Sequence, residues 1–378
     1  MFGGGGGVSL CLFVAWSLLV VVCPCGVGLA TPVALAAGLN KAARNHILIR
    51  DTSALEQMRN VDVVVFDKTG TLTEGHPTVI GWLWAQGQEE HYKDVLLAAE
   101  STSDHPLAEA IVTALEGEEQ VIPAHLDGFE SIAGKGVRVA YQGAEYWVGS
   151  HKLLKDYQAN LSDILADMLT QYESDGNSIV YFGRENDLLA VIAIKDQLRV
   201  TSMEAIRELR IQDVEICMLT GDGERTASSV AGSLGIMRFV ADAMPDDKED
   251  FIHKLQLQGK TVAMVGDGVN DARALSCADV SIAMGKGTDT LMDTAMITLR
   301  TSDLLLLPKV FRLSRQTVSL MYRNLFWAFI YNTVGIFVAA GVLYPVYDIL
   351  LSPALAGAVM ALSCVSVALS SLRLSSRF

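Results

Sequence analysis

At 378 residues, of which 51% are hydrophobic and 19% charged, the chain is too apolar on average for an ordinary soluble enzyme. The formal net charge of -14, from 43 acidic and 29 basic residues, argues against nucleic acid as a partner. Six cysteines, most of them in strongly apolar segments, indicate reduced thiols or metal ligands rather than a secreted disulfide framework.

Three segments are apolar over about 20 residues, the length that crosses a bilayer. They run from about residue 8 to 37, from 325 to 343 and from 353 to 372. Basic residues flank the expected inner ends of these segments, at Lys41, Arg44, Arg312, Arg315 and Arg373. The positive-inside rule then predicts an integral protein of the cytoplasmic membrane, with the large middle portion and the C-terminus in the cytoplasm.

The first apolar segment contains Cys23-Pro24-Cys25. Pro24 removes a helix hydrogen bond and opens a turn, so that both sulfurs can face a cavity at membrane depth. Soft thiolates favour Cu(I), with Zn²⁺ next. From the residues alone, two buried thiols beside a structural kink are at least as good an interpretation.

An apolar run over residues 61–66 ends at Asp67 and is followed by Lys68-Thr69-Gly70-Thr71. This pattern predicts a buried strand that delivers a carboxylate into a Gly/Thr-rich turn. Ligands of open α/β sheets bind at the carboxyl ends of the strands, and a carboxylate there can act as a nucleophile. The interpretation without function is a turn with a capping Asp.

The cytosolic portion alternates between strands and helices. Helical periods cover residues 94–115, 201–210 and 225–234, and strand patterns cover 137–148, 188–194, 215–219 and 261–265. The last strand leads into a second acidic loop, Gly266–Asp271. Two acidic strand-end loops predict a Mg²⁺-dependent phosphoryl-transfer site, so the strands that carry them must meet. The simplest topology then makes the middle region, about residues 78–190, an insertion in a doubly wound α/β domain.

The series Asp67-Lys68-Thr69-Gly70-Thr71-Leu72-Thr73, Thr220-Gly221-Asp222, Lys248 and Gly266–Asp271 resembles the P-type ATPases. Cys23-Pro24-Cys25 and His105-Pro106 are marks of the heavy-metal-transporting branch. From about Ser9 to Leu374 the chain looks like the C-terminal portion of its copper(I)-exporter subgroup. The resemblance implies a haloacid dehalogenase-like phosphorylation domain with an inserted α+β nucleotide-binding domain, plus transmembrane α-helices.

The segments expected from this resemblance are a transmembrane helix (1–38), two parts of the phosphorylation domain (39–77 and 191–303), the nucleotide-binding domain (78–190), and a stalk helix with two transmembrane helices (304–378).

The resemblance also assigns roles to single residues. Asp67 would attack the γ-phosphate of ATP, and Mg²⁺ would be held by Asp67, Asp267 and the backbone carbonyl of Thr69, which are hard oxygen ligands. Lys248, Thr220 and Asn270 would hold the transferring phosphoryl oxygens, and Asp271 would orient the site.

Glu100, His105, Gly134 and Gly136 match nucleotide-binding positions of the heavy-metal branch. The glycines would allow close approach of the backbone to adenine or ribose, and His105 would orient the nucleotide. A His-Pro pair is otherwise typical of a helix start, because Pro106 suits the first helical position.

In the second and third apolar segments, Tyr331, Asn332, Met360 and Ser363 match the copper(I) pattern and join Cys23 and Cys25 as transport ligands. No Lys or Asp lies inside these two segments, whereas the zinc/cadmium/lead subgroup would carry one. Ordinary packing would also explain Met360. A Zn²⁺/Cd²⁺ exporter and a non-cycling fragment or pseudo-pump remain the alternatives.

The chain departs from the family pattern at Ser150, Gln197, Arg273, Phe337 and Cys364. It also lacks the Thr-Gly-Glu sequence that family pumps carry on an actuator domain. We therefore expect the actuator domain and the earlier membrane spans before Met1. The expected partners are the missing part of the pump, the lipid membrane, the metal ion and a metallochaperone. The chain as given is expected to bind ATP and autophosphorylate but not to pump.

Cys217 and Cys277 are expected to be small buried hydrophobic residues. The histidines other than His105 show no metal-binding spacing.

Overall fold

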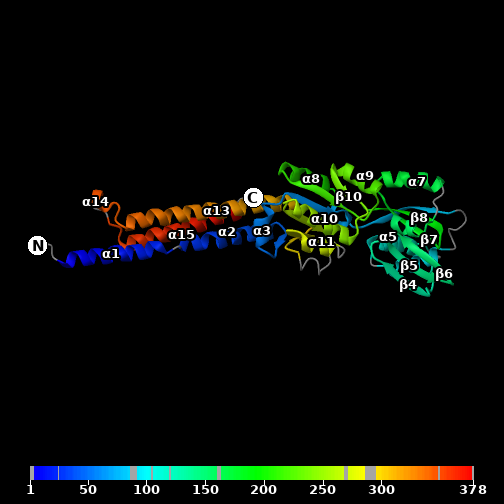
Figure 1. Cartoon of the computed structure of the whole chain (residues 1–378), viewed down its shortest axis with the longest axis horizontal. Helices are drawn as coiled ribbons and strands as arrows, with labels where there is room; N and C mark the ends of the chain where they lie inside the picture. The colour runs from blue at the N-terminus through cyan, green and yellow to red at the C-terminus, as the bar shows by residue number, and fades with distance from the viewer. Residues whose placement is uncertain are drawn as a thin grey trace. The chain divides into compact units, whose positions relative to one another are not determined.

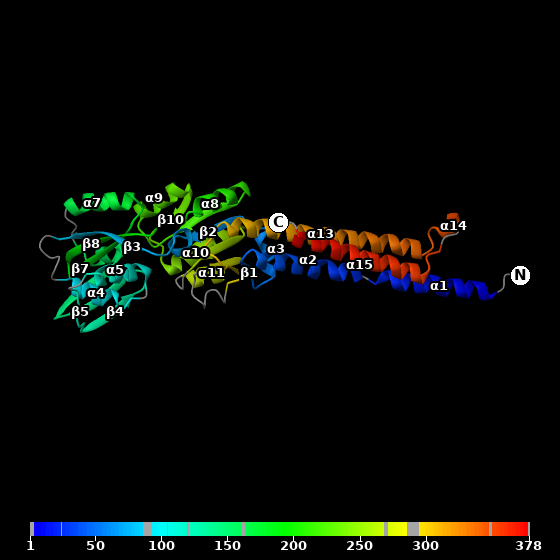
Figure 2. The same ribbon diagram turned by 180° about the vertical axis from the view of Figure 1, so that it is seen from behind.

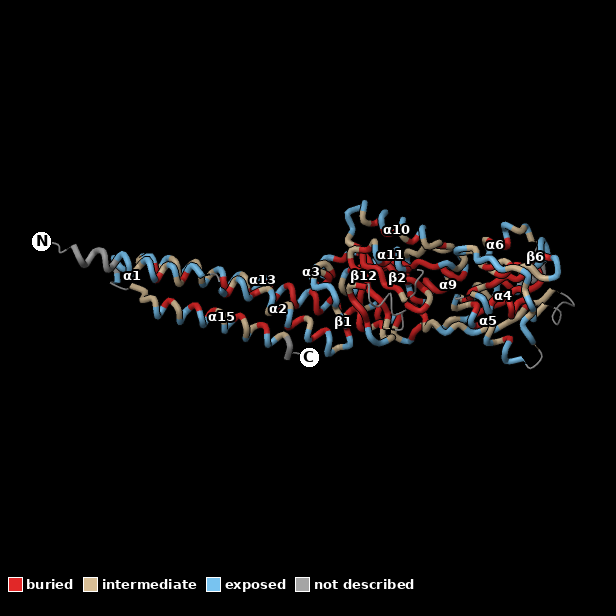
Figure 3. Tube along the Cα trace, turned by 90° about the horizontal axis from the view of Figure 1, so that it is seen from below, coloured by how far each residue is buried: buried red, intermediate tan, exposed pale blue. Residues whose placement is uncertain are grey.

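The computed structural model describes residues 4–23, 25–85, 92–103, 105–118, 121–159, 163–267, 271–285, 295–347 and 350–376. The chain divides into two compact units, one formed by residues 1–60 with 309–378 and the other by residues 61–308 (Figures 1 and 2). We refer to them as the helical unit and the α/β unit. The strands of the α/β unit form the most deeply buried part of the chain (Figure 3).

The first sheet of the α/β unit is parallel, and its strands follow the order β13-β12-β11-β2-β9-β10. Their bounds are β2 (Val63–Asp67), β9 (Glu215–Leu219), β10 (Arg238–Val240), β11 (Val262–Gly266), β12 (Val280–Met284) and β13 (Ile297–Leu299). Helices α8 (Ser202–Ile211) and α9 (Glu224–Leu234) lie on one face, whereas α10 (Pro245–Leu257) and α11 (Ala272–Cys277) lie on the other (Figures 1 and 2).

This sheet confirms the doubly wound prediction. Every residue of β2 and β11 is buried, as expected for parallel strands covered by helices on both faces. Val63, Val65, Cys217 and Met264 belong to one core cluster, so the predicted burial of Cys217 is confirmed. Because β2 pairs with β9 and with β11, the carboxyl ends of these three strands meet at one edge.

The second sheet is antiparallel, in the order β3-β8-β7-β6-β5-β4. Its strands are β3 (Thr78–Trp84), β4 (Gly128–Ile132), β5 (Gly136–Tyr141), β6 (Ala144–Gly149), β7 (Ser178–Arg184) and β8 (Asp187–Lys195). The helices of this region are α4 (Lys93–Glu100), α5 (Pro106–Glu116), α6 (His151–Asp156) and α7 (Asp163–Ser174). The predicted hairpin over 137–148 is present, with positive φ at both Gln142 and Gly143, as a tight two-residue turn requires.

Three expectations about this region are wrong. The expected domain boundary at residue 190 falls inside β8, and the strand expected at 188–194 belongs to the inserted sheet rather than to the first sheet. An apolar run with buried faces looks the same in either sheet, so the sequence did not separate them. The single helical period over 94–115 is two helices, because the chain turns at residues 101–105 before Pro106 begins α5.

The helical unit contains α1 (Gly4–Val22), α2 (Cys25–Arg44), β1 (Ile47–Ile49), α3 (Ser53–Met58), most of α13 (Leu306–Ala339), α14 (Tyr344–Tyr347) and α15 (Pro353–Ser376). Helices α2, α13 and α15 run side by side (Figures 1 and 2). The first expected span is therefore two helices, with a break at Cys23.

Among the described residues, two helical segments are long and apolar enough to cross a membrane, Cys11–Arg44 and Pro353–Leu374. The span expected over 325–343 is not among them, because α13 ends at Ala339 and polar residues such as Asn332 interrupt its apolar part. Large apolar side chains nevertheless lie exposed on α1, α13 and α15, including those of Trp16, Phe326, Phe329, Leu362 and Leu372. Such a surface is typical of contact with lipid or with further helices.

Candidate functional site

Asp67 is the last residue of the central strand β2, and only 6% of its surface is exposed. Its Oδ1 lies 2.5 Å from the Nζ of Lys248, which comes from the first half of α10. Among the residues that the structure describes, none donates a hydrogen bond to the other oxygen, Oδ2. The strand therefore presents a buried carboxylate with one oxygen paired and one oxygen available.

The turn after Asp67 passes directly beside Asp267. Gly70 adopts a φ of +70°, and a Cβ placed on it would lie 1.4 Å from the Asp267 Oδ2. The close approach and the left-handed backbone both require glycine at this position. The Gly/Thr-rich sequence of the turn thus has a physical reason, since it lets the backbone reach the second acidic loop.

Asp67, Asp267 and Asp271 form a carboxylate cluster in which one oxygen from each side chain lies within 4.8 Å of the others. Lys248 also contacts Asp271, with 2.8 Å between Nζ and Oδ1. Burial and the charge of Asp67 raise the pKa of Asp267 to about 7 and that of Asp271 to about 7. Burial alone would lower the pKa of Lys248, but Asp67 and Asp271 raise it above its ordinary value, so the lysine stays charged.

This donor set fits a Mg²⁺ ion. Three carboxylates converge while the Lys248 ammonium contacts two of them, and burial together with the negative charge of Asp67 explains the raised pKa values of Asp267 and Asp271. Hard oxygen ligands with surplus negative charge are what Mg²⁺ takes in phosphate-handling sites. The Thr69 carbonyl, in the same turn, stays a prediction as a further ligand.

Binding of Mg²⁺ to the α/β unit is expected to depend on pH. The folded protein holds protons on Asp267 and Asp271 up to about pH 7, whereas the unfolded chain releases them near pH 4. These groups therefore stabilise the metal-free protein most below about pH 4, and that stability is lost as the pH rises to about 7. Since Mg²⁺ binds the ionised carboxylates, it should raise the unfolding midpoint more at about pH 8 than at about pH 6.

Unfolding followed by tryptophan fluorescence, with Mg²⁺ and with a chelator, measures this difference. Asp267→Asn should lose most of the Mg²⁺-induced gain at the higher pH. A gain of equal size at both pH values would contradict the assignment of the ion to these carboxylates.

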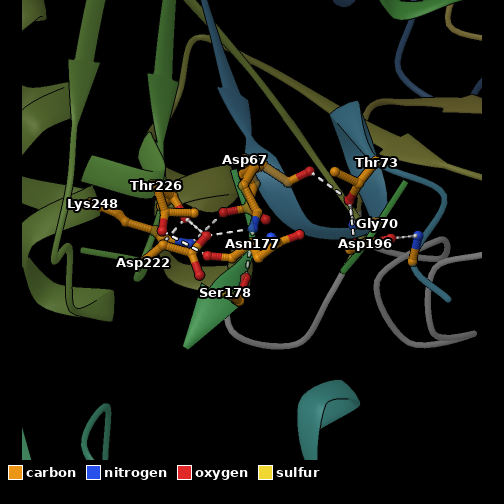
Figure 4. A network of polar contacts seen from close by, with 12 residues as sticks. Asp67, Gly70, Thr73, Asn177, Ser178, Asp196, Asp222, Thr226 and Lys248 are labelled. Atoms are coloured by element: carbon orange, nitrogen blue, oxygen red, sulfur yellow. Dashed lines mark hydrogen bonds and ion pairs between the residues drawn. The ribbon is translucent and has the colours of Figure 1, made fainter. Parts of the chain in front are cut away.

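Lys68 forms a second buried ion pair, with Asp222, next to the first one (Figure 4). The Lys68 Nζ also donates to the Ser178 Oγ, at 3.0 Å. Burial by itself would raise the pKa of Asp222, but Lys68 and Ser178 lower it overall, so this carboxylate is ionised. Thr220 lies at the end of β9 and donates to the Asp222 Oδ2 over 2.8 Å, which orients the loop after that strand.

A third set of contacts fixes the turn that follows Asp67, through Gly70, Thr73 and Asp196 (Figure 4). The Thr73 Oγ1 lies 2.5 Å from the Asp196 carboxylate and accepts from the Gly70 N–H at 2.9 Å. Arg199 donates to the carbonyls of Gly70 and Thr71. No role for Asp196 or Arg199 was predicted from the sequence, although Asp196 directly follows β8 and Asp67 ends β2.

The predicted nucleotide residues lie in the inserted region. Glu100 ends α4 with 7% of its surface exposed, and burial raises its pKa to about 7. His105 caps α5 by accepting the Leu107 N–H at Nδ1, so the predicted role at a helix start is confirmed for this ring nitrogen. Burial lowers the pKa of His105, and the charges of Asp222 and Asp67 oppose this shift.

The two predicted glycines have a structural reason that the sequence did not show. A Cβ on Gly136 would lie 2.1 Å from the Val148 carbonyl oxygen, and one on Gly134 would lie 2.7 Å from the Met244 side chain. Both have positive φ. The backbone itself therefore requires glycine at position 136, and the left-handed φ favours it at position 134. The close approach of a nucleotide stays a prediction.

The predicted transport ligands lie in the helical unit. Cys23 and Cys25 are exposed and their thiols touch. The next residue, Gly26, packs between α13 and α15: a Cβ there would lie 2.8 Å from the Ser363 Oγ and 3.4 Å from the Ala328 Cβ. The Cys23–Cys25 turn is therefore adjacent to the helices that carry the other predicted ligands.

Tyr331 and Asn332 follow Ala328 by one helical turn, and buried Met360 precedes Ser363 by about one turn on the same face of α15. The Asn332 Oδ1 and the Ser363 Oγ are buried and have no hydrogen-bond partner within the described ranges. A bound ligand would provide the missing partner for buried polar atoms of this kind.

Asn270, the remaining predicted catalytic residue, lies outside the described residues together with Gly268 and Val269. Pro24 lies outside them as well.

Comparison with known proteins agrees with this geometry. The haloacid dehalogenase-like hydrolase family matches residues 61–279, which is the segment that carries the strand-end carboxylates. The chain belongs to this family of hydrolases.

Along nearly its whole length the chain is also similar to heavy-metal P-type ATPases. A copper-exporting P-type ATPase of Legionella pneumophila is 42% identical over 367 residues, which cover 97% of this chain and 50% of the relative. A silver-exporting P-type ATPase of Salmonella typhimurium is 43% identical over 97% of this chain and 44% of its own length. The chain thus spans about half the length of the curated relatives that it matches.

Two solved structures extend the likeness. A zinc-transporting PIB-type ATPase in the E2.Pi state superposes with a TM-score of 0.66 and 34% identity, over 95% of this chain and 57% of that one. The catalytic domain of the CPx-ATPase CopB-B gives a TM-score of 0.60 and 28% identity, over 72% of this chain and 97% of that domain.

Proposed function

We propose that the chain carries the phosphorylation domain, the inserted nucleotide-binding domain and the C-terminal membrane helices of an ATP-driven exporter of Cu(I). The observation that carries the proposal is the buried Asp67 carboxylate, with Oδ1 paired to Lys248 and Oδ2 available beside Asp267 and Asp271. The similarity to copper- and silver-exporting P-type ATPases supports it.

In the proposed reaction, the Asp67 Oδ2 attacks the γ-phosphorus of ATP. The bond between that phosphorus and the oxygen bridging the β- and γ-phosphates breaks, ADP leaves with the electron pair, and an aspartyl phosphate remains. Lys248 neutralises charge on the nucleophile and on the incoming phosphoryl group, and Asp271 holds the Lys248 ammonium in place. Thr220 and Asn270 would contact the phosphoryl oxygens.

Asp67, Asp267 and the Thr69 carbonyl would hold Mg²⁺, which when bound supplies positive charge to the transferring phosphoryl group. The nucleotide would lie against the inserted region, near Glu100 and His105. A carboxyl group with a pKa of about 7 can both donate and accept a hydrogen bond near neutral pH, which suits the edge of an adenine ring.

Incubation of the purified chain with γ-labelled ATP and Mg²⁺, followed by an acid quench, tests the reaction. A labelled protein that loses its label to hydroxylamine supports the proposal, because hydroxylamine cleaves acyl phosphates. A chain that binds ATP but never acquires label would instead be the non-cycling fragment or pseudo-pump that the sequence leaves as an alternative.

For the transported ion, Cu(I) is favoured over Zn²⁺ by the ligands available. Two thiols and the Met360 thioether are soft donors, and no Lys or Asp occurs in residues 325–343 or 353–372. The solved zinc transporter keeps the zinc exporter as the second candidate. In the full-length parent protein, stimulation of ATP hydrolysis by Zn²⁺ but not by Cu(I) would favour that candidate.

Cys25→Ser is expected to remove high-affinity Cu(I) binding by the detergent-solubilised chain, because a hard hydroxyl replaces one of two adjacent soft donors. Competition with a chromophoric Cu(I) chelator measures the loss. Cys11→Ser is the matched control, since it makes the same change in the same apolar segment about four helical turns away. Equal loss in both variants would indicate a general effect on the helices rather than a ligand at Cys25.

A further inference from the structure

Three side chains of different chemistry meet on the surface of the α/β unit, away from the carboxylate cluster. Glu249 and His253 lie one turn apart on α10, and Cys277 ends α11. One potential ligand atom from each lies within 4.8 Å of the other two. The Glu249 Oε1 is 3.6 Å from the Cys277 Sγ and 3.9 Å from the His253 Nε2. Cys277 is thus half-buried beside a carboxylate, not the buried hydrophobic residue that the sequence predicts.

The neighbouring Gln256 fixes the protonation of the histidine ring. Its Nε2 donates to the Cys277 carbonyl at 2.9 Å, so its Oε1 must be the atom that lies 3.2 Å from the His253 Nδ1. An amide oxygen only accepts, so Nδ1 carries a hydrogen. In the neutral ring Nε2 then carries the lone pair, 3.9 Å from the Glu249 Oε1. A histidine that donates Nδ1–H to a carbonyl oxygen has the outer-sphere hydrogen bond usual for metal-ligating histidines.

We propose that Glu249, His253 and Cys277 bind a Zn²⁺ ion. A tetrahedral ion with bonds of about 2.3 Å to sulfur and about 2.1 Å to oxygen or nitrogen separates its sulfur and oxygen ligands by about 3.6 Å and its nitrogen and oxygen ligands by about 3.4 Å. The observed sulfur–oxygen separation of 3.6 Å matches this spacing, and the observed nitrogen–oxygen separation of 3.9 Å is slightly longer. Three ligands of the types that zinc prefers leave a fourth position for water.

The surroundings also suit such a site. Arg273 holds the other carboxylate oxygen, Oε2, at 2.8 Å and leaves Oε1 for the ion. The same guanidinium pairs with Asp246, which offsets its positive charge. The His253 side chain is 51% exposed, so an ion can enter from solvent.

Bound Zn²⁺ would tie α10 to α11. Lys248 directly precedes Glu249, and Asp271 directly precedes α11, so both helices also carry groups of the carboxylate cluster. Zinc at this site would therefore restrain the distance between Lys248 and Asp271. This is a role apart from the transport of a metal through the helical unit.

Co²⁺, a spectroscopic substitute for Zn²⁺, tests the site in the purified full-length chain. The chain should carry Cys23→Ser and Cys25→Ser, so that the membrane thiols contribute no signal. We expect one equivalent of Co²⁺ to give a thiolate-to-cobalt charge-transfer band and tetrahedral visible bands, which Zn²⁺ then abolishes. His253→Gln should weaken binding by at least about tenfold, and Cys277→Ser should remove the charge-transfer band.

The matched control is His125→Gln, an exposed histidine of the inserted region, which should leave binding unchanged. Zn²⁺ should also raise the unfolding midpoint of the parent chain but not that of Cys277→Ser. Equal unfolding midpoints of the two proteins without metal would show that the variant folds. A missing charge-transfer band, or a band that persists in Cys277→Ser, would overturn the proposal. His253 and Glu249 would then be an ordinary surface pair.

Discussion

Asp67→Asn is expected to lower the yield of hydroxylamine-sensitive phosphoprotein by at least about a thousandfold, to background, because the amide has no nucleophilic carboxylate oxygen. Acid-quenched labelling with γ-labelled ATP measures it. The variant should fold, since the amide has nearly the same shape as the carboxylate. Its carbonyl oxygen can still accept the hydrogen bond from Lys248.

Asp213→Asn is the matched control. It makes the same chemical change in the same unit, at an exposed residue whose φ of 61° asparagine tolerates well. Labelling should be unchanged there. Phosphoprotein that survives in Asp67→Asn would mean that another side chain is the nucleophile, and the assignment of the reaction would have to be abandoned.

Gly70→Ala is expected to reduce phosphoprotein formation by about a hundredfold, because misplacing reacting groups by about 1 Å has effects of that size. A Cβ at Gly70 would lie 1.4 Å from the Asp267 Oδ2, so either the turn or the carboxylate must move. The dependence of labelling on Mg²⁺ concentration should shift upward in the residual activity.

Gly259→Ala separates this clash from backbone strain. Gly259 follows α10 with a φ of +77°, close to the +70° of Gly70, but a Cβ there meets nothing within 4 Å. Strain alone should lower the stability of this variant by about 1 kcal/mol and leave its labelling intact. If both variants lost labelling equally, strain rather than the approach to Asp267 would be the cause.

The carboxylate cluster could be predicted from the sequence because each part of it is local. Asp67 ends one continuous apolar strand and Asp267 directly follows another, and parallel strands bring their carboxyl ends to one edge. Lys248 came from the resemblance alone, since a lysine in the first turns of a helix has no local signal for its target. The structure supplies that target at 2.5 Å.

Other features could not be predicted, because they depend on packing between distant segments. Lys68 pairs with Asp222, which lies beyond the insertion in the chain, and with Ser178, which lies within the insertion. The spacing of Glu249 and His253 is visible on one helix, but Cys277 reaches them from another helix. The sequence also offered a nucleotide as the reason for Gly136, whereas the backbone of β6 provides a simpler one.

The contact of Lys68 with Ser178 has a mechanical consequence. Ser178 is the first residue of β7 in the inserted sheet, and the Thr226 hydroxyl of α9 donates to the carbonyl of the preceding Asn177. A displacement of the insertion that moved Ser178 would break its hydrogen bond with Lys68 and leave the lysine paired with Asp222. Displacement of the insertion would thereby change the electrostatic environment of the nucleophile, without any change in the strand that carries Asp67.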